Sequence, residues 1–186
     1  MKSLLFVLTT ISIFSSYTTA QSQFIEKGGF GAMFFAATTS NEFGNSIGGG
    51  LGVSIGGIVD LGFSLAKASA GNVNKEVSSG HIGIFVSKSK ANFSLDLGYM
   101  SGIGSSNVLV GFNFSKNFNL SKDIQLQPSC SYHLTFLSGT SSTPPASAFG
   151  ISLDFLISRH FIFSPNFGSV NNTMFGGLSI GLLFGN

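Results

Sequence analysis

The stretch NFSLDLGYMSG, residues 92–102, alternates apolar and polar side chains. Successive side chains of a β-strand point to opposite faces of the sheet, so strict alternation predicts a strand with two unlike faces. In a soluble protein the apolar face would pack on a core, whereas in a transmembrane barrel it would meet lipid. The apolar side chains of the stretch are Phe93, Leu95, Leu97 and Tyr99, and Ser94, Asp96 and Gly98 stand between them.

The same alternation recurs along the rest of the chain, where short apolar and polar dyads are separated by turn residues. Regular short strands with turn signals between them predict an all-β sandwich or barrel. We predict ten strands, with eight or twelve left open, at residues 24–37, 46–55, 58–67, 81–87, 92–102, 107–116, 123–137, 148–157, 161–170 and 174–185.

The composition decides which face of these strands meets water. Only 9% of the 186 residues are charged, whereas a water-washed protein surface carries about 25–35% charged residues. The polar faces hold mainly Gly, Ser, Asn, Gln and Thr, which indicates an enclosed interior, and the broad apolar faces suit lipid. The formal net charge of +2 gives no basis for binding nucleic acid.

The first twenty residues, MKSLLFVLTTISIFSSYTTA, have the features of a secretory signal peptide. Lys2 gives a positive start, residues 4–14 form a short apolar segment, and residues 18–20 are a small-residue cleavage site. We therefore predict a signal peptide at residues 1–20 and a single domain at residues 21–186. No apolar run after residue 20 reaches the length of about 18 residues that a spanning helix needs.

A spanning sheet must close on itself, because unpaired backbone groups are too costly in hydrocarbon. Segments of about 9–11 residues match a tilted strand across a bilayer. The expected fold is therefore an all-β, closed, antiparallel up-and-down transmembrane β-barrel with both termini at one end. The links after the second, fourth, sixth and eighth strands look short, and those after the first, third, fifth and seventh are mostly longer, as in barrels with short periplasmic turns and longer external loops.

The signal peptide, the repeated dyads and the last strand, MFGGLSIGLLFGN with its aromatic Phe184, carry a resemblance. The chain resembles the small bacterial outer-membrane β-barrel proteins, the class that includes OmpA- and OmpX-like barrels. The resemblance implies a location in the bacterial cell outer membrane and contact with outer-membrane lipid. It also implies recognition of the final strand by the outer-membrane assembly machinery.

A small set of polar side chains falls on the predicted lumen face and forms the candidate site. Two interpretations of its carboxylates stay open, namely an acidic lumen that favours cations, or buried groups satisfied by polar neighbours. The members are Asp60, Asp96, Asp154, His81, His133, Gln125 and Gln127.

Other chemistry has weak support in the sequence. His81 and His133 are expected near the rim that carries the long loops, where membrane enzymes place catalytic groups. Three scattered histidines and the single Cys130 lack metal-ligand spacing. The glycine-rich stretches at Gly28 and Gly48 do not open a helix after a strand, so a nucleotide site fails on context. We predict no catalytic residues, no cofactor and no metal.

The sequence leaves several functions open for a barrel of this kind. The first is a structural role or the passive passage of small polar solutes. The second is surface binding through polar loops at residues 68–80 and 138–147. The third is an enzyme at the rim, and the fourth is a soluble secreted barrel with an apolar pocket.

Overall fold

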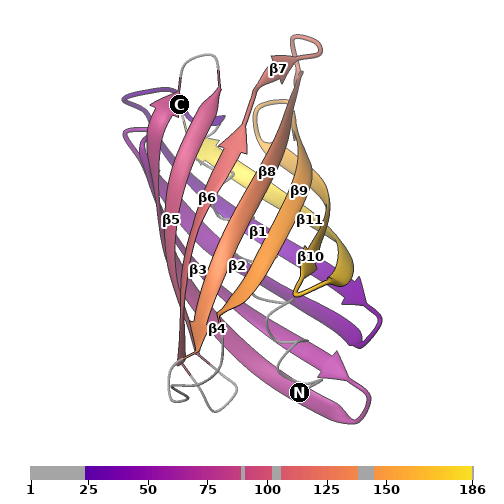
Figure 1. The fold of residues 1–186 in the computed structure, drawn as a ribbon. Coiled ribbons are helices and arrows are strands. Elements are labelled where there is room, and N and C mark those ends of the chain that lie inside the picture. The colour runs from indigo at the N-terminus through magenta and orange to yellow at the C-terminus, as the bar shows by residue number, and fades with distance from the viewer. Residues whose placement is uncertain (1–23, 89–90, 102–105, 138–144, 186) are drawn as a thin grey trace.

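The computed structural model describes residues 24–88, 91–101, 106–137 and 145–185. Ten long strands form one closed antiparallel barrel, and β7 (Phe118–Asn119) is a two-residue strand that pairs only with β8 (Figure 1). The predicted barrel of ten strands is therefore confirmed. The long strands are β1 (Phe30–Asn41), β2 (Gly44–Ile55), β3 (Val59–Ala70), β4 (Val73–Lys88), β5 (Asn92–Ser101), β6 (Ser106–Ser115), β8 (Ile124–Leu137), β9 (Ala146–Ile157), β10 (Phe161–Val170) and β11 (Thr173–Gly185).

Each strand pairs with its neighbours along the chain, and two further pairings close the cylinder. The first and last strands meet, with Gly31 opposite Gly185, and β6 pairs with β8 across the short β7. The start of β1 and the end of β11 therefore lie at the same end of the barrel, as predicted. The turns at residues 56–58 and 158–160 lie at this end too; we call it the terminal end.

The predicted asymmetry of link lengths is wrong. The links between β1 and β2, between β3 and β4, and between β10 and β11 hold two residues each. The expected polar loop at residues 68–80 is a continuous hairpin, in which Ala70 pairs with Val73. Gly71, at φ +57°, forms the tight turn, because such hairpin turns need a positive φ. Of the expected loop at residues 138–147, residues 138–144 lie outside the described residues, and β9 begins at Ala146.

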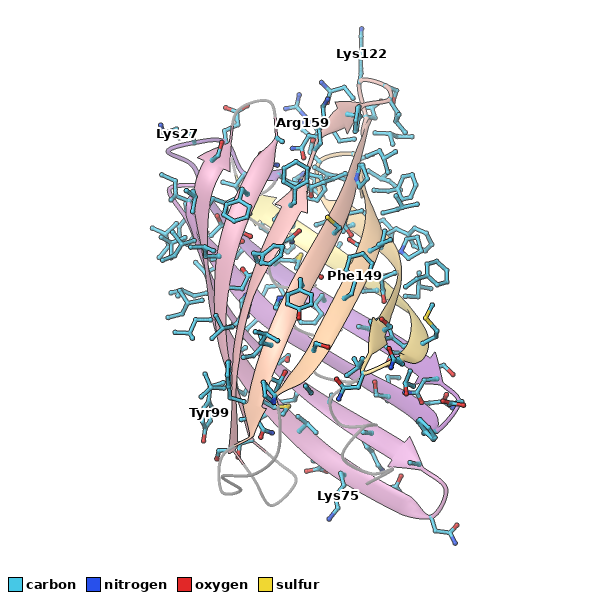
Figure 2. All side chains as sticks on the ribbon, in the orientation of Figure 1. Lys27, Lys75, Tyr99, Lys122, Phe149 and Arg159 are labelled. Atoms are coloured by element: carbon cyan, nitrogen blue, oxygen red, sulfur yellow. The ribbon has the colours of Figure 1, made fainter. Side chains whose placement is uncertain are left out.

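The two faces of the wall differ as the sequence predicts. Large apolar side chains point outward all round the barrel, and Phe34, Leu97 and Phe167 expose 57%, 53% and 64% of their surface. Figure 2 shows these side chains around the outside, with Lys27, Lys122 and Arg159 at one end and Lys75 at the other. The outer surface is therefore an apolar band with cations beyond it, which suits a bilayer and its headgroups.

The interior also contains apolar side chains that the sequence interpretation did not assign to it. Met33 and Phe35 of β1 point inward and pack with Leu156, Ile162 and Leu183. The segment FGAMFFAA, residues 30–37, has apolar residues or glycine at every position. Alternation therefore could not show which of its side chains face inward. The interior is consequently mixed, because other members of the same buried apolar cluster, such as Val77, Met100 and Leu109, come from strands that also carry inward polar residues.

Two prolines lie within long strands at places where the pairing changes. Pro128 stands just beyond Ser129, the last residue of β8 that pairs with β6. Pro165 stands where the pairing between β9 and β10 is interrupted, since no partner on β9 opposes Ser164 or Pro165. Proline cannot donate to a strand pairing, so both positions tolerate it. None of the described residues forms a helix long and apolar enough to cross a membrane.

Candidate functional site in the barrel lumen

The strand register brings three of the candidate residues into one line across the inner wall. Asp60 lies opposite Gly83, Gly83 opposite Asp96, Asp96 opposite Gly111, and Gly111 opposite His133. Neighbouring strands lie about 4.8 Å apart, so the backbones of Asp60 and Asp96 are about 10 Å apart. We call Asp60, Asp96 and His133, with Gly83 and Gly111 between them, the lumen row.

Within the lumen row, Asp96 and His133 form a close pair. Nε2 of His133 lies 3.6 Å from Oδ2 of Asp96, and both side chains are almost completely buried in the interior. A Cβ atom at residue 111 would overlap the imidazole of His133. Gly111 therefore creates the space in which the ring lies flat against the wall and reaches Asp96.

The carboxylate of Asp96 is only weakly satisfied by the protein. The distance of 3.6 Å to His133 is too long for a hydrogen bond. Within the described part of the chain, neither carboxylate oxygen of Asp96 accepts a hydrogen bond. A buried carboxylate without hydrogen bonds carries a large desolvation cost unless a ligand or water supplies them. Among the candidate carboxylates, Asp96 is therefore the one whose two oxygens are most available to interact with a ligand.

His81 occupies a neighbouring row with a similar design. It faces inward from β4 with Gly62 and Gly98 directly opposite on the two adjacent strands. His81 and His133 both lie within their strands, with paired residues on either side. The expected position of these histidines at the rim is therefore wrong. His81 lies deeper because the hairpin of β3 and β4 extends where a loop was predicted, and His133 is paired with Gly111 in the middle of β6.

Asp154 has very different surroundings from Asp96. Its carboxylate accepts hydrogen bonds from the hydroxyls of Ser164 at 2.5 Å and Ser152 at 3.2 Å. Ser152 in turn shares a hydrogen bond of 2.7 Å with Ser129. This serine cluster was not recognised from the sequence, where serines are frequent on every lumen face. Asp154 therefore fits the structural interpretation, in which neighbours satisfy a buried carboxylate.

The two candidate glutamines lie toward the terminal end. Gln127 is fully buried opposite Asp154, and its amide donates to Ser115 and Asn117. Gln125 is half-buried and pairs with Asn119 of β7. The amide of Gln127 therefore connects β8 to β6 and to the link that follows β6. Neither glutamine belongs to the lumen row.

The charges of the interior are all of one sign. The charged residues buried in the described part of the chain are Asp60, Asp96 and Asp154, and no lysine or arginine is among them. The described residues contain no group of three or more His, Cys, Asp or Glu side chains placed to hold a metal ion. The lumen is therefore acidic, with His81 and His133 as its inward imidazoles.

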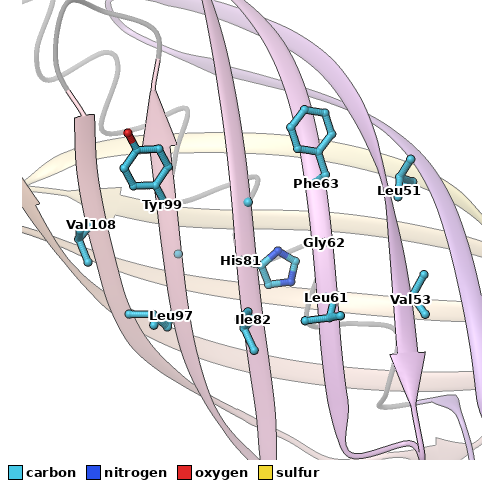
Figure 3. Close-up of a pocket in the computed structure, with 12 residues that line it drawn as sticks. Leu51, Val53, Leu61, Gly62, Phe63, His81, Ile82, Leu97, Tyr99 and Val108 are labelled. Atoms are coloured by element: carbon cyan, nitrogen blue, oxygen red, sulfur yellow. The ribbon is translucent and has the colours of Figure 1, made fainter.

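The outer surface of the barrel carries a groove over strands β2 to β6 (Figure 3). The groove has a volume of about 680 Å³ and is apolar. It is centred where Gly80 stands between Phe63 and Tyr99 in the strand register. Leu61, Ile82 and Leu97 also line it and point outward from the barrel. The groove is thus part of the apolar outer band, and its lining also includes His81 and the two glycines opposite it, Gly62 and Gly98.

Comparisons with known proteins identify the fold. No family model matches the chain, and no curated protein matches it in sequence. Among solved structures, the KdgM porin is similar with a TM-score of 0.51 and 10% identity, covering 81% of this chain and 98% of that one. The KdgM porin in complex with disordered oligogalacturonate gives the same values. The N-terminal β-barrel domain of Pseudomonas aeruginosa OprF has a TM-score of 0.43 and 11% identity, covering 83% and 97% of the two chains.

These similarities have one structural meaning. The chain has the fold of the bacterial outer-membrane β-barrel proteins, as the sequence resemblance implied. The outward band of apolar side chains provides the lipid-facing surface that this fold needs. The chain therefore has a transmembrane β-barrel fold with an apolar outer band that suits a bilayer.

Proposed function

We propose that the chain forms a narrow passive pore for small polar solutes. The observation that carries this proposal is the construction of the lumen row. Small residues alternate with ionisable ones across β3 to β8, and the ring of His133 lies along the wall above Gly111. Side chains that lie along the wall leave the axis of a barrel less obstructed than side chains that point toward it.

The dimensions of the barrel agree with a pore for small solutes only. Ten strands tilted by about 40° give a backbone diameter of about 20 Å, before inward side chains are counted. The inward side chains Asp60, Asp96 and His133 expose 3% of their surface or less. Any passage at this level is therefore too narrow for large solutes, and we propose small inorganic ions as its cargo.

The experiment is single-channel conductance of the refolded mature chain in a planar bilayer. A pore gives discrete conductance steps, and migration on a gel before and after heating shows that the inserted protein is folded. A folded, inserted barrel that gives no steps would overturn the pore and leave the structural role. The near-complete burial of the inward side chains is the observation that favours that second candidate.

Two other functions have less support. The surface-binding hypothesis used a loop at residues 68–80, but this segment is a paired hairpin. For an enzyme, Nε2 of His133 would need a nucleophile within reach, yet this nitrogen faces Asp96. We therefore propose a barrel that catalyses no reaction. Deleting the hairpin tip at residues 70–73 tests binding, since an adhesion barrel would lose its partner while a pore would keep its conductance.

The targeting of the chain is also a proposal. We infer that residues 1–20 are a cleaved signal peptide, which precede the barrel domain and lie outside the described residues. We further propose that the assembly machinery of the outer membrane recognises β11. Sequencing the amino terminus of the membrane-inserted protein tests the cleavage, with Gln21 as the expected first residue.

A further inference from the structure

We propose that the lumen row is a selectivity site that attracts small monovalent cations and repels anions. This inference rests on the proposed pore and names the class of solute that the pore prefers. It depends on the placement of Asp60, Asp96 and His133 in one line across adjacent strands.

The sign of the site follows from its charges. With both carboxylates ionised, the row carries a charge of −2 when His133 is neutral and −1 when His133 is protonated, by addition over Asp60, Asp96 and His133. The row therefore stays negative in both protonation states of the imidazole. No buried lysine or arginine of the described residues offsets it.

Asp96 is the strongest point of attraction in the row. Its oxygens accept no hydrogen bond from the described residues, so a passing cation meets a carboxylate that the protein has not already satisfied. A cation also recovers part of the solvation that this buried carboxylate has lost. Asp154 differs in this respect, because Ser152 and Ser164 donate to its oxygens.

The site favours small monovalent ions for a physical reason. Asp60, Asp96 and His133 are almost completely buried, so the proposed passage beside them is narrow. The described residues provide no cluster of three ligands that would hold a divalent metal tightly. A unit charge about 4 Å from an ion in water changes the local concentration of that ion about fivefold. Such an interaction is strong enough to select by sign and weak enough for the ion to leave.

The experiment measures the K⁺ to Cl⁻ permeability ratio of the refolded chain from its reversal potential in a KCl gradient. The expected ratio for the natural sequence is at least about fivefold in favour of K⁺. The double variant Asp60→Asn and Asp96→Asn should bring the ratio close to equality. The matched control is Asp123→Asn, which makes the same chemical change at an exposed carboxylate beside β8 and should leave the ratio unchanged.

The outcomes separate this inference from the pore itself. A conducting natural chain that is unselective or prefers Cl⁻ overturns the selectivity site and leaves the pore in place. A double variant that conducts with the ratio of the natural chain also overturns it. If the double variant does not fold, the sign of selectivity in the natural chain and the single variant Asp96→Asn decide the question. A folded chain without conductance overturns the pore, and the selectivity site falls with it.

Discussion

Two arcs of the inner wall hold buried carboxylates in opposite ways. On the arc from β3 to β8, Asp96 faces glycines on both adjacent strands, and the imidazole of His133 lies 3.6 Å from its carboxylate. On the arc from β8 to β10, Asp154 accepts hydrogen bonds from Ser152 and Ser164. Both residues are buried aspartates at inward positions of long strands. The carboxylate of Asp96 accepts no hydrogen bond from the described residues, whereas that of Asp154 accepts two.

The residues opposite each aspartate explain the difference. Glycine has no side chain that could donate a hydrogen bond, and the ring of His133 occupies the space that a Cβ atom would take at Gly111. Serine offers a hydroxyl, which stabilises a neighbouring carboxylate and holds its side chain in place. The arc with glycines is therefore suited to interaction with solutes, and the arc with serines is suited to stability.

The largest effect is expected from closing the space above Gly111. In Gly111→Ala, the new Cβ would overlap the ring of His133 and would stand 2.7 Å from the carbonyl oxygen of Tyr132. Because a backbone atom cannot move aside easily, we expect a loss of about 1–3 kcal/mol in the free energy of unfolding. Urea unfolding of the barrel in lipid vesicles measures it.

The control for this prediction is Gly80→Ala, which adds the same methyl group on the outer face. The nearest atom to that Cβ is the carbonyl oxygen of Gly62 at 3.7 Å, an ordinary contact. This variant should unfold at nearly the same urea concentration as the natural chain. Equal losses in the two variants would show that the glycine of the lumen row has no special role.

The sequence could predict which side chains share a face of a strand, but it could not predict which residues meet across neighbouring strands. Alternation along Phe93 to Tyr99 gave both the strand and its two faces correctly, because a period of two needs no knowledge of neighbouring strands. The meeting of Asp96 with His133 could not be found in this way. These residues are far apart along the chain, and only the register between β5, β6 and β8 places them together.

Three other features of the molecule were hidden from the sequence for physical reasons. Gly71 turns a polar stretch into a hairpin whose strands pair fully, so polarity alone did not indicate a loop. Met33 and Phe35 lie on the inner face of a strand that is apolar at both parities. The hydrogen bonds of Asp154 depend on which serines of three strands face it, although serine occurs on nearly every lumen face.

A smaller effect on stability should separate the two aspartates directly. Asp154→Ala removes an acceptor from two buried serine hydroxyls, and we expect a loss of about 2 kcal/mol in the free energy of unfolding. Asp96→Ala should cost much less or even stabilise, because removing a carboxylate that accepts no hydrogen bond relieves its desolvation. Matched urea unfolding of both variants measures the difference, and a larger loss for Asp96→Ala would contradict the contrast between the arcs.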